Sequence, residues 1–465
     1  MTATPPRIVV LGGGIAGLGA AWECHRRGLA ATVLERQDRA GGVIRTDRVA
    51  TADGVFVLDA GPDAFLISKP GARDLCDELG LTSQLIAMEA PRGAYVLRDD
   101  TLHALPEGGA FGVATRVVPF LRSTLLSPLG KLRVAVEPVL PARTTADDES
   151  TGDFFRRRFG REFAIRVAQP LLGGIHAGDL DRLSAAAVVP QLVAVERAGK
   201  SVLLSLRAQG RRRVEGGPFR SFRQGMTALV DALVQQLPPD TVRVGTEVVS
   251  VARVDGAWRV NTSRGSSLEA DILLMAAPAP VVASWLAPIS ADASGLAAGV
   301  RYVSSAGVLA AYRSTDIARP LRGSGYVSTP EARGERLLAT SWLTGKWAGR
   351  APAGFTILRG FYGGACDQAA LASTDEALAA DAHASWARRF GVGAPAVLSR
   401  VVRWERCSPQ HDVGHLARIG ALDAALQSLG GLGVAGSGFR AIGIPDVISD
   451  ARAEVRRLLD AWRAR

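Results

Sequence analysis

The chain has 465 residues, of which 47% are hydrophobic, and it carries a formal net charge of +10. Its length exceeds what one hydrophobic core supports, so we expect two or three domains, and its composition excludes a disordered protein. It has no basic stripe with interleaved aromatic residues and no nucleic-acid-binding module, so we expect no nucleic-acid partner.

The positive charge is almost entirely arginine. Genomic base composition explains it as well as attraction to anionic lipid or to a polycarboxylate does. The four cysteines are scattered and form no CxxC pair, which fits reduced thiols in the cytoplasm. No secretory signal is visible at the N-terminus. Residues 272–291 are uncharged but contain three prolines, so we expect a strand, a turn and a short helix there, and no transmembrane helix.

The first predicted elements form a βαβ unit over residues 7–35. A short apolar strand, 7–11, precedes a helix over 18–27, and a second strand, 31–34, ends in an acid. The glycine-rich turn between strand and helix has the GxGxxG form and comprises Gly12, Gly13, Gly14, Ile15, Ala16 and Gly17. This pattern predicts a dinucleotide-binding fold, although a bare glycine-rich turn also occurs in ordinary α/β proteins.

Each of these residue types has a mechanical role. Gly12 permits the tight turn, Gly14 lets the backbone approach a pyrophosphate, and Gly17 allows close packing of helix and strand. The start of the helix offers free N–H groups to the phosphates. Glu35 can accept hydrogen bonds from a ribose, which argues against a 2′-phosphate and therefore against NADP.

Residues 36–45 distinguish FAD from NAD. They contain Arg36 and a Gly-Gly pair followed by Val43, and they end at Arg45. The segment resembles the second glycine motif of the flavoprotein superfamily that includes amine oxidases, phytoene desaturases and protoporphyrinogen oxidases. The resemblance implies FAD, with Arg36, Gly42 and Val43 near the cofactor and Arg45 near its pyrophosphate, where a guanidinium can make paired hydrogen bonds. Read alone, the segment is a loop with a solvated arginine.

A second loop follows at residues 58–66, where a Gly-Pro pair forces a turn. The segment resembles one in porphyrinogen oxidases that returns to the flavin. The resemblance therefore assigns four residues to the cofactor site, namely Gly61, Pro62, Asp63 and Ala64. Alanine stands at residue 64 where serine is common in that family, so a hydroxyl contact is not expected there.

The middle of the chain carries the most specific resemblance. Segments 92–96, 102–108, 127–138, 148–160 and 170–184 together resemble the protoporphyrinogen oxidase family, including its coproporphyrinogen-oxidising bacterial branch. Ser150 and Asp153 predict a capping box and hence a helix start. Residues 117–126 suit a surface helix that could enter a bilayer, although core packing explains them equally well. The resemblance favours a helical, membrane-touching domain.

The remaining cofactor residues lie in the second half of the chain. The resemblance implies a backbone contact at Val248 and also assigns Trp404. Val248 lies in a strand region over 242–254, which an Asp255-Gly256 hairpin turn should join to a second strand over 257–262. At the start of the last helix, the N–H groups of Ile442, Gly443 and Ile444 would face the flavin pyrimidine, where a helix N-terminus stabilises negative charge. Residue 411 is His where the family usually has Tyr.

These observations predict an α/β protein with three parts. The parts are a discontinuous FAD-binding Rossmann-like domain, a mixed-sheet substrate domain and an inserted helical membrane-associating domain. The expected boundaries are 1–84, 206–280 and 421–465 for the FAD-binding domain, 85–205 for the helical domain and 281–420 for the substrate domain.

The sequence names no catalytic side chain. It has no HExxH motif or paired CxxC, so no metal is expected, and it has no GxSxG motif, while its six histidines form no evident cluster. The resemblance implies a flavin-based, six-electron oxidation of protoporphyrinogen IX to protoporphyrin IX in haem biosynthesis, with dioxygen as acceptor. Oxidation of coproporphyrinogen III to coproporphyrin III is the alternative. Another amine oxidase or carotenoid desaturase, and a flavin-holding membrane scaffold without turnover, are further readings.

Three residues are candidates for the substrate site. Arg92 matches a family position suited to a propionate, and Lys69 is a second candidate cation, while either could be an ordinary surface charge. Gly174 matches a glycine beside the macrocycle, although it could be a plain turn residue. Porphyrinogens are hydrophobic and oxidise in air, so we expect a cytoplasmic protein that attaches peripherally to the inner membrane. The oligomeric state stays open, and a homodimer is one state it includes.

Overall fold

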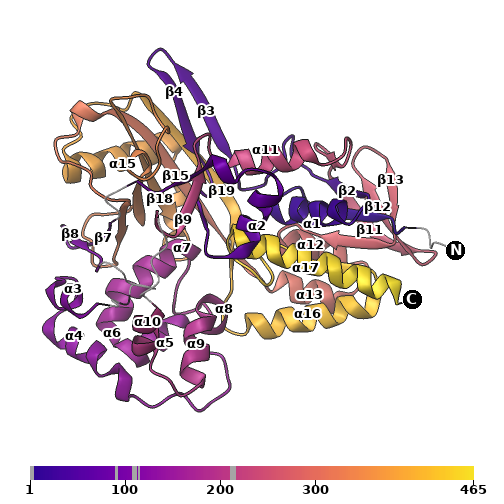
Figure 1. Cartoon of the computed structure of the whole chain (residues 1–465), viewed down its shortest axis with the longest axis horizontal. Helices are drawn as coiled ribbons and strands as arrows, with labels where there is room; N and C mark the ends of the chain where they lie inside the picture. The colour runs from indigo at the N-terminus through magenta and orange to yellow at the C-terminus, as the bar shows by residue number, and fades with distance from the viewer. Residues whose placement is uncertain (1–4, 90–92, 107–112, 114–115, 210–215, 465) are drawn as a thin grey trace.

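Five parallel strands form the sheet at which the two ends of the chain meet (Figure 1). The computed structural model describes residues 5–89, 93–106, 113, 116–209 and 216–464. The strand order is β10-β2-β1-β14-β20. These strands span Val242–Arg243, Ala31–Leu34, Ile8–Leu11, Ile272–Met275 and Leu432–Val434. A single sheet is thus assembled from segments more than 400 positions apart in the chain.

Alternate side chains of the central strands face two different cores, as a pleated strand requires. Ile8 and Val10 pack with one layer of helices, whereas Val9 and Leu11 pack with the other. The first layer consists of α1 (Ile15–Arg26), α2 (Pro70–Glu78), α11 (Thr227–Gln236) and α17 (Ile444–Arg463). The second consists of α12 (Ala279–Leu286), α13 (Ala291–Ala298) and α16 (His415–Leu429). Residues 281–298 therefore pack with the five-stranded sheet, although we expected them in the substrate domain.

A three-stranded antiparallel sheet lies beside the second layer. It comprises β11 (Val248–Val254), β12 (Ala257–Thr262) and β13 (Ser267–Ala270). Asp255 and Gly256 connect the first two strands with positive φ angles of 51° and 82°, which is the geometry of the predicted hairpin turn.

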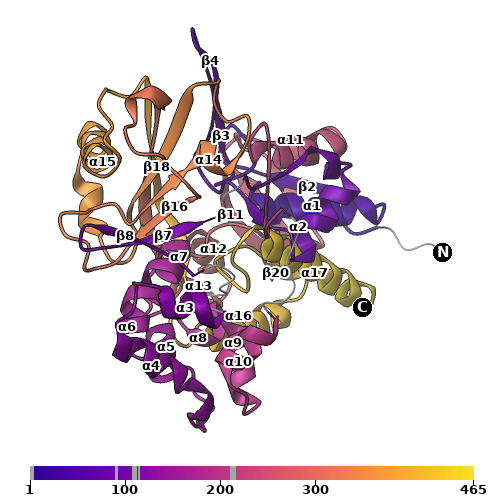
Figure 2. The same cartoon turned by 60° about the vertical axis from the view of Figure 1, so that its left-hand side comes forward.

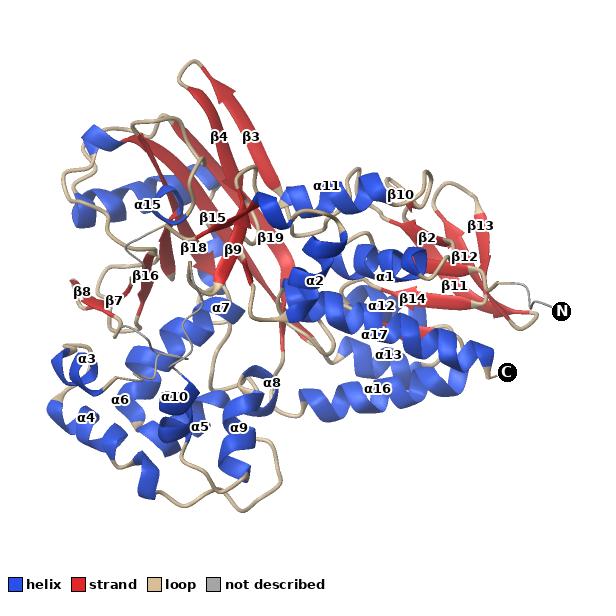
Figure 3. Ribbon diagram, in the orientation of Figure 1, coloured by secondary structure: helices blue, strands red, loops and turns tan. Residues whose placement is uncertain are grey.

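A seven-stranded sheet forms the second large region (Figure 3). Its strand order is β19-β15-β18-β17-β16-β7-β8. These strands span Leu398–Gln410, Arg301–Arg313, Phe355–Gly363, Ala339–Trp342, Gly325–Ser328, Ala94–Arg98 and Thr101–Ala104. Helix α15 (Asp375–Phe390) covers one face, and α14 (Leu343–Lys346) lies on the other. Short 3₁₀ turns accompany this region at Ser314–Asp316 and Gln368–Ala372.

The hairpin β3 (Thr46–Thr51) and β4 (Gly54–Asp59) projects from the body of the molecule in both views (Figures 1 and 2). A small sheet follows it, with β9 (Phe219–Phe222) between β5 (Phe65–Leu66) and β6 (Leu85–Ala87), and a 3₁₀ turn at Thr82–Gln84 precedes β6. We expected residues 85–205 to be helical, but residues 85–104 contain β6, β7 and β8. The strand pairing explains this difference, because β7 extends the large sheet through β16.

The helical region begins after these strands. It comprises α3 (Val117–Arg122), α4 (Pro128–Ala135), α5 (Thr151–Phe159), α6 (Arg161–Phe163), the π-helix η3 (Ala164–Gly173), α7 (Gly174–His176), α8 (Ala185–Val188), α9 (Pro190–Arg197) and α10 (Val202–Gln209), with a 3₁₀ turn at Glu137–Val139. The N-cap half of the predicted capping box is present, because Ser150 Oγ accepts from Asp153 N at 3.0 Å, and the Ser150 hydroxyl donates to Asp153 Oδ2 at 2.7 Å. Arg158 is buried against Glu137, so α5 does not present all three of its arginines to solvent. Within the described residues, no helix is both long and apolar enough to cross a membrane.

Candidate functional site

The glycine turn between β1 and α1 leaves a backbone-lined space at its centre. A Cβ at Gly12 would lie 2.4 Å from the carbonyl oxygen of Ala276, and one at Gly17 would lie 1.9 Å from that of Gly12. A Cβ at Gly14 would meet nothing within 4 Å. Two glycines are therefore required by packing, whereas Gly14, at the N-terminus of α1, borders open space suited to a phosphate group.

Glu35 ends β2 and turns back to this glycine turn. Its Oε2 accepts a hydrogen bond from Gly13 N at 2.7 Å, and its Oε1 accepts one from Gln37 N at 2.8 Å. A carboxylate has about four acceptor positions, so two remain for a ribose.

The second glycine loop is attached directly to the first. Gly41 N donates to Gly13 O at 2.8 Å, and Gly42, with a φ of 58°, lies against the backbone of Gly14. The loop is held from behind by Arg39, whose guanidinium donates to the carbonyls of Gly42 and Ile44 at 2.6 and 3.2 Å. This contact of Arg39 was not expected from the sequence, because its partners are main-chain carbonyls that no side-chain pattern reveals.

The other predicted members of this loop face outward. Val43 is 44% exposed, and Arg36 is also exposed. Arg45 pairs with Asp47 through two bonds, of 2.8 and 3.1 Å. Its guanidinium is thus engaged locally, with 44% of the side chain still exposed.

The turn at Gly61 packs onto this same loop. A Cβ at Gly61 would lie 1.8 Å from the carbonyl oxygen of Val43, so only glycine fits. Asp63 Oδ2 accepts hydrogen bonds from Lys346 Nζ at 2.5 Å and from Trp347 Nε1 at 3.0 Å. Burial alone would raise the pKa of Asp63, but the nearby cations outweigh it and hold that pKa below its usual value. The carboxylate is therefore ionised and bound to the protein.

The C-terminal motif reaches the same place from the other end of the chain. After β20, Gly436 has a φ of 125° and lies opposite Ala16 at the start of α1. Helix α17 then begins at Ile444, and no side chain caps it. Arg440 anchors the connecting loop, because it donates to Asp423 at 3.0 Å and to the carbonyl of Val434 at 2.9 Å. The first N–H groups of α17 are left available to a ligand.

Two other predicted cofactor residues make defined contacts. The carbonyl of Val248 accepts a hydrogen bond from Trp285 Nε1 at 3.2 Å, so that acceptor is already engaged. Trp404 Nε1 donates to the carbonyl of Ala60 at 3.1 Å, which places the indole beside the Gly61 turn. Trp404 is thus brought to the site, whereas Val248 lies on the neighbouring three-stranded sheet.

The three candidate substrate residues differ in their surroundings. Arg92 lies outside the described residues. Lys69 forms an ion pair with Asp446 at the start of α17. Gly174 is exposed, and among the described residues a Cβ there would contact Val327, at 3.8 Å. Because Val327 belongs to β16, Gly174 lies where the helical region meets the large sheet.

Three of the six histidines come together, which corrects the expectation that they form no cluster. The rings of His411 and His415 stack at 3.8 Å, and His176 is close enough to lower the pKa of His411. Burial is the main cause of that shift to about 3, and burial also lowers the pKa of His176 to about 4. His411 and His415 contact the carbonyls of Ser437 and Phe439, at 2.9 and 2.6 Å. The cluster therefore supports the loop after β20, with neutral rings.

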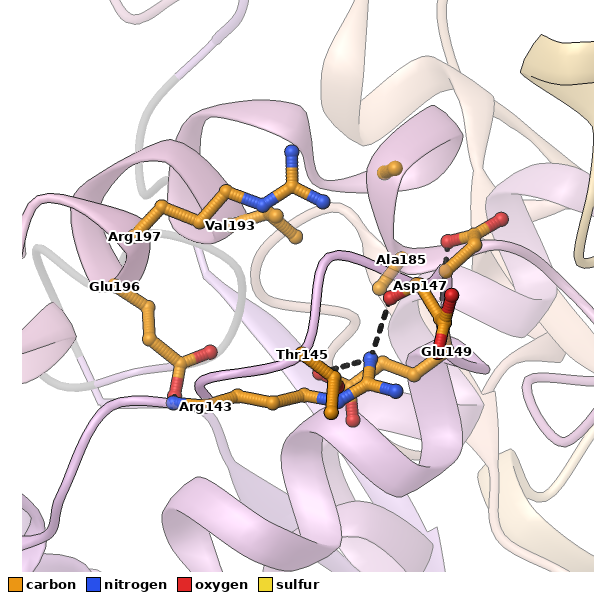
Figure 4. Close-up of a pocket in the computed structure, with 10 residues that line it drawn as sticks. Arg143, Thr145, Asp147, Glu149, Ala185, Val193, Glu196 and Arg197 are labelled. Carbon is orange, nitrogen blue, oxygen red and sulfur yellow. Dashed lines mark hydrogen bonds and ion pairs between the residues drawn. The ribbon is translucent and has the colours of Figure 1, made fainter.

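A small cavity that opens to solvent lies in the helical region, away from these motifs (Figure 4). Its lining includes Arg143, Glu149 and Arg197. Arg143 Nη1 donates to the carbonyl of Asp147 at 2.8 Å, so much of the lining is engaged internally. None of the predicted cofactor residues borders this cavity.

The residues present fit a flavin dinucleotide. The open space at Gly14, the free start of α1, the carboxylate of Glu35 and the free start of α17 lie on segments that touch one another. Among the described residues, no group of three or more His, Cys, Asp or Glu side chains is arranged to hold a metal ion.

Comparisons with known proteins agree with this arrangement. A family model described as "Flavin containing amine oxidoreductase" matches residues 15–459. The coproporphyrinogen III oxidase of Bacillus subtilis (strain 168) is 32% identical over 462 residues, covering 96% of this chain and 97% of that one. Protoporphyrinogen oxidase 2 of Arabidopsis thaliana is 26% identical, covering 93% and 89%. The crystal structure of a protein from Exiguobacterium sp. 255-15 has a TM-score of 0.86 at 27% identity, covering 98% and 99%.

Proposed function

We propose, from the premise that this chain belongs to the flavin-containing amine oxidoreductase family, that it oxidises a porphyrinogen to the corresponding porphyrin. The chain is a flavin-dependent oxidoreductase, and FAD is its cofactor. The preferred substrate in this proposal is coproporphyrinogen III. The observation that carries it is the match, over almost the full length of both chains, to a relative named coproporphyrinogen III oxidase.

Protoporphyrinogen IX is the second candidate substrate. A plant relative named protoporphyrinogen oxidase matches most of the chain at lower identity. Protoporphyrinogen IX has vinyl groups at the two positions where coproporphyrinogen III has propionates. A chain with a net charge of +10 is suited to the more anionic of the two.

A porphyrinogen loses six hydrogens on becoming a porphyrin, so a bound flavin would accept two electrons in each of three cycles. Dioxygen would be the final electron acceptor. The protein would bind and orient the flavin and the porphyrinogen, and it would shield them from solvent. In this proposal the two glycine loops and Glu35 hold the dinucleotide, and the first N–H groups of α17, at Ile444, hold the pyrimidine edge of the ring. A positive helix end there favours negative charge.

The substrate would lie between the helical region and the large sheet. Gly174 supports this assignment, because it is exposed at this junction and a Cβ there would lie 3.8 Å from Val327 of the large sheet. Lys69 is a less suitable propionate partner than its position in the sequence indicated, since Asp446 already neutralises it. Arg92 remains the proposed cation for a propionate.

We also propose that the helical region touches the cytoplasmic face of the membrane through an apolar helical patch. The patch consists of Val117, Val118, Leu121, Leu129, Leu132 and Val139, each at least half exposed. It spans α3, α4 and the following 3₁₀ turn, and Lys131 joins the first two by donating to the carbonyl of Leu121 at 2.7 Å. Exposed apolar side chains beside basic residues favour binding to anionic lipid.

Anaerobic stopped-flow spectroscopy tests the main proposal. The FAD-loaded protein is mixed with coproporphyrinogen III or with protoporphyrinogen IX, and the oxidised flavin band is followed. We expect faster bleaching with coproporphyrinogen III. Faster bleaching with protoporphyrinogen IX would reverse the substrate order. If neither bleaches the flavin while dithionite does, the porphyrinogen assignment fails.

A further inference from the structure

Five charged side chains are packed behind the Gly61 turn. Asp59 and Arg350 form one buried ion pair, at 2.7 Å. Asp63 and Lys346 form a second ion pair, at 2.5 Å, which is partly exposed. The fifth residue is Arg359, on β18 of the large sheet. Three cations thus face two carboxylates, which leaves one positive charge in excess.

Arg359 carries that excess charge. It is 6% exposed, and among the residues that the structure describes no carboxylate lies within 4.0 Å of its guanidinium. Its Nη1 and Nη2 donate to the carbonyls of Gly61 and Ala60 at 2.5 and 2.8 Å. Its Cζ lies 4.6 Å from the ring centroid of Phe361, and its Nε is buried with no hydrogen-bond partner in the described part of the chain. Burial lowers the pKa of the guanidinium, yet arginine remains charged in proteins.

A buried charge without a paired opposite charge is unfavourable, and such groups concentrate at functional sites. A hydrophobic side chain of similar volume would fill this place at lower energetic cost. Packing alone therefore does not explain the charge of Arg359.

The backbone that Arg359 contacts also borders the cofactor cradle. Gly61 packs against the carbonyl of Val43, and the loop that contains Val43 is bonded to Gly13 through Gly41. Trp404 contacts the same carbonyl of Ala60 that Arg359 does. Only one layer of backbone thus separates the guanidinium from the surface formed by the two glycine loops.

We propose that Arg359 is a positioning residue that holds a net positive charge behind the Ala60–Gly61 backbone and thereby raises the reduction potential of the bound flavin. A flavin gains negative charge when it is reduced, and a buried cation close to it stabilises that charge, because the local dielectric is low. This role rests on the flavin assignment but is independent of which substrate is oxidised.

The test compares the redox equilibrium of FAD-loaded variants with a reference dye, with no porphyrinogen present. The variants are Arg359→Met, which removes the charge, and Arg359→Lys, which keeps it. In Arg359→Met we expect the ratio of reduced to oxidised flavin, at a fixed dye potential, to fall at least about tenfold, or about 30 mV for two electrons. In Arg359→Lys we expect a fall of less than about threefold, because the charge remains.

A charge change of the opposite sign gives an independent measurement. Asp63→Asn removes a negative charge beside Arg359, so we expect the same ratio to rise. Arg389→Met is the matched control, since Arg389 is also a buried arginine of this region but is paired with Glu335 at 2.7 Å. We expect no shift in that control.

An unchanged ratio in FAD-loaded Arg359→Met would overturn the proposal. A ratio that falls in Asp63→Asn, or a shift in the Arg389→Met control as large as that in Arg359→Met, would do the same. If Arg359→Met does not retain FAD, the other two variants test the proposal. It then requires that the ratio of reduced to oxidised flavin rises in Asp63→Asn and falls less than about threefold in Arg359→Lys. Because the potential is measured without substrate, a failed porphyrinogen assay leaves this result intact, and the converse also holds.

Discussion

The carboxylate of Glu35 binds the backbone N–H of Gly13 at 2.7 Å, so the acid at the end of β2 holds the glycine turn in place. Its other oxygen binds the backbone N–H of Gln37. The same side chain that the motif assigns to a ribose therefore also organises the turn itself. Glu35 links the shape of the cradle to ligand recognition.

Replacing Glu35 with alanine should weaken FAD binding more than loss of one ribose contact would. Two backbone donors lose a charged acceptor, and hydrogen bonds to charged groups contribute about 1.5–3 kcal/mol each. We expect the Kd for FAD to rise at least about tenfold, measured by titrating the apoprotein. Glu269→Ala, which removes an exposed carboxylate, is the control and should leave the Kd unchanged. Equal affinities for both variants would contradict this role.

The glycines of the first motif should separate into two classes. Gly14→Ala places a methyl group in open space, so the melting temperature of the apoprotein should stay the same while FAD binding weakens. Gly17→Ala forces a Cβ to within 1.9 Å of the carbonyl of Gly12 and should destabilise the apoprotein itself. Thermal unfolding of the two apoproteins measures the difference in their stability. A clear loss of stability in Gly14→Ala would show that its role is packing.

The histidine cluster should make the protein sensitive to mild acid. His411 and His176 have folded-state pKa values lowered to about 3 and about 4, so both are neutral when folded at pH 5. In the unfolded chain their pKa is about 6.5, so that state binds more protons as the pH falls below 6.5. The stability that these two neutral histidines contribute is thus present above pH 6.5 and is lost as the pH falls toward 4. Each histidine should contribute a loss of about 2 kcal/mol between pH 7 and pH 5.

Urea unfolding of the apoprotein at several pH values measures this dependence. His411→Tyr removes one titrating ring and supplies a hydroxyl donor in its place, so the stability of this variant should fall less steeply with acid. His25→Asn is the control, because His25 is exposed and should leave the slope unchanged. Parallel pH profiles for His411→Tyr and the unaltered protein would show that the ring titrates normally.

A large side chain at Gly174 should block the substrate without affecting the flavin. Gly174→Leu extends into the open space beside Val327. We expect dithionite reduction and FAD content to stay normal, while bleaching by a porphyrinogen slows at least about tenfold, equivalent to 1.4 kcal/mol. Equal bleaching rates in the variant and the unaltered protein would remove Gly174 from the substrate site.

Charged residues in the apolar helical patch should abolish binding to lipid. Leu129 and Leu132 are 78% and 62% exposed, so Leu129→Asp with Leu132→Asp should fold normally. We expect the unaltered protein, but not this double variant, to sediment with vesicles that contain anionic phospholipid. Val249→Asp, at an exposed site on β11, is the control. If the unaltered protein does not sediment with the vesicles, the membrane proposal fails.

Local contacts explain what the sequence predicted well. The strand, glycine turn and helix of residues 7–35 lie within one short stretch, and Gly17 is required by the carbonyl of Gly12 in the same turn. The capping box at Ser150 and the hairpin at Asp255 are equally local. Side-chain size and backbone conformation over a few residues determine such features. The two FAD motifs at opposite ends of the chain could be recognised for the same reason.

Residues 85–104 show why other features were missed. Their strands exist because β7 pairs with β16, which lies more than 200 residues later, so the segment itself does not specify them. The stacking of His411 and His415 is short-range in sequence, but their burial requires His176 and the loop after β20. Neither pattern is visible until distant segments meet.

The sequence by itself determined the dinucleotide cradle and the family resemblance, because those depend on residue types at fixed short spacings. Only the tertiary structure decided the electrostatics around that cradle. Arg359 reaches the carbonyl of Gly61 across 298 positions of the chain, and Lys346 reaches Asp63 across 283. Whether a charge is paired, and how far it is removed from water, depends on which segments fold against each other, and that sets its energy.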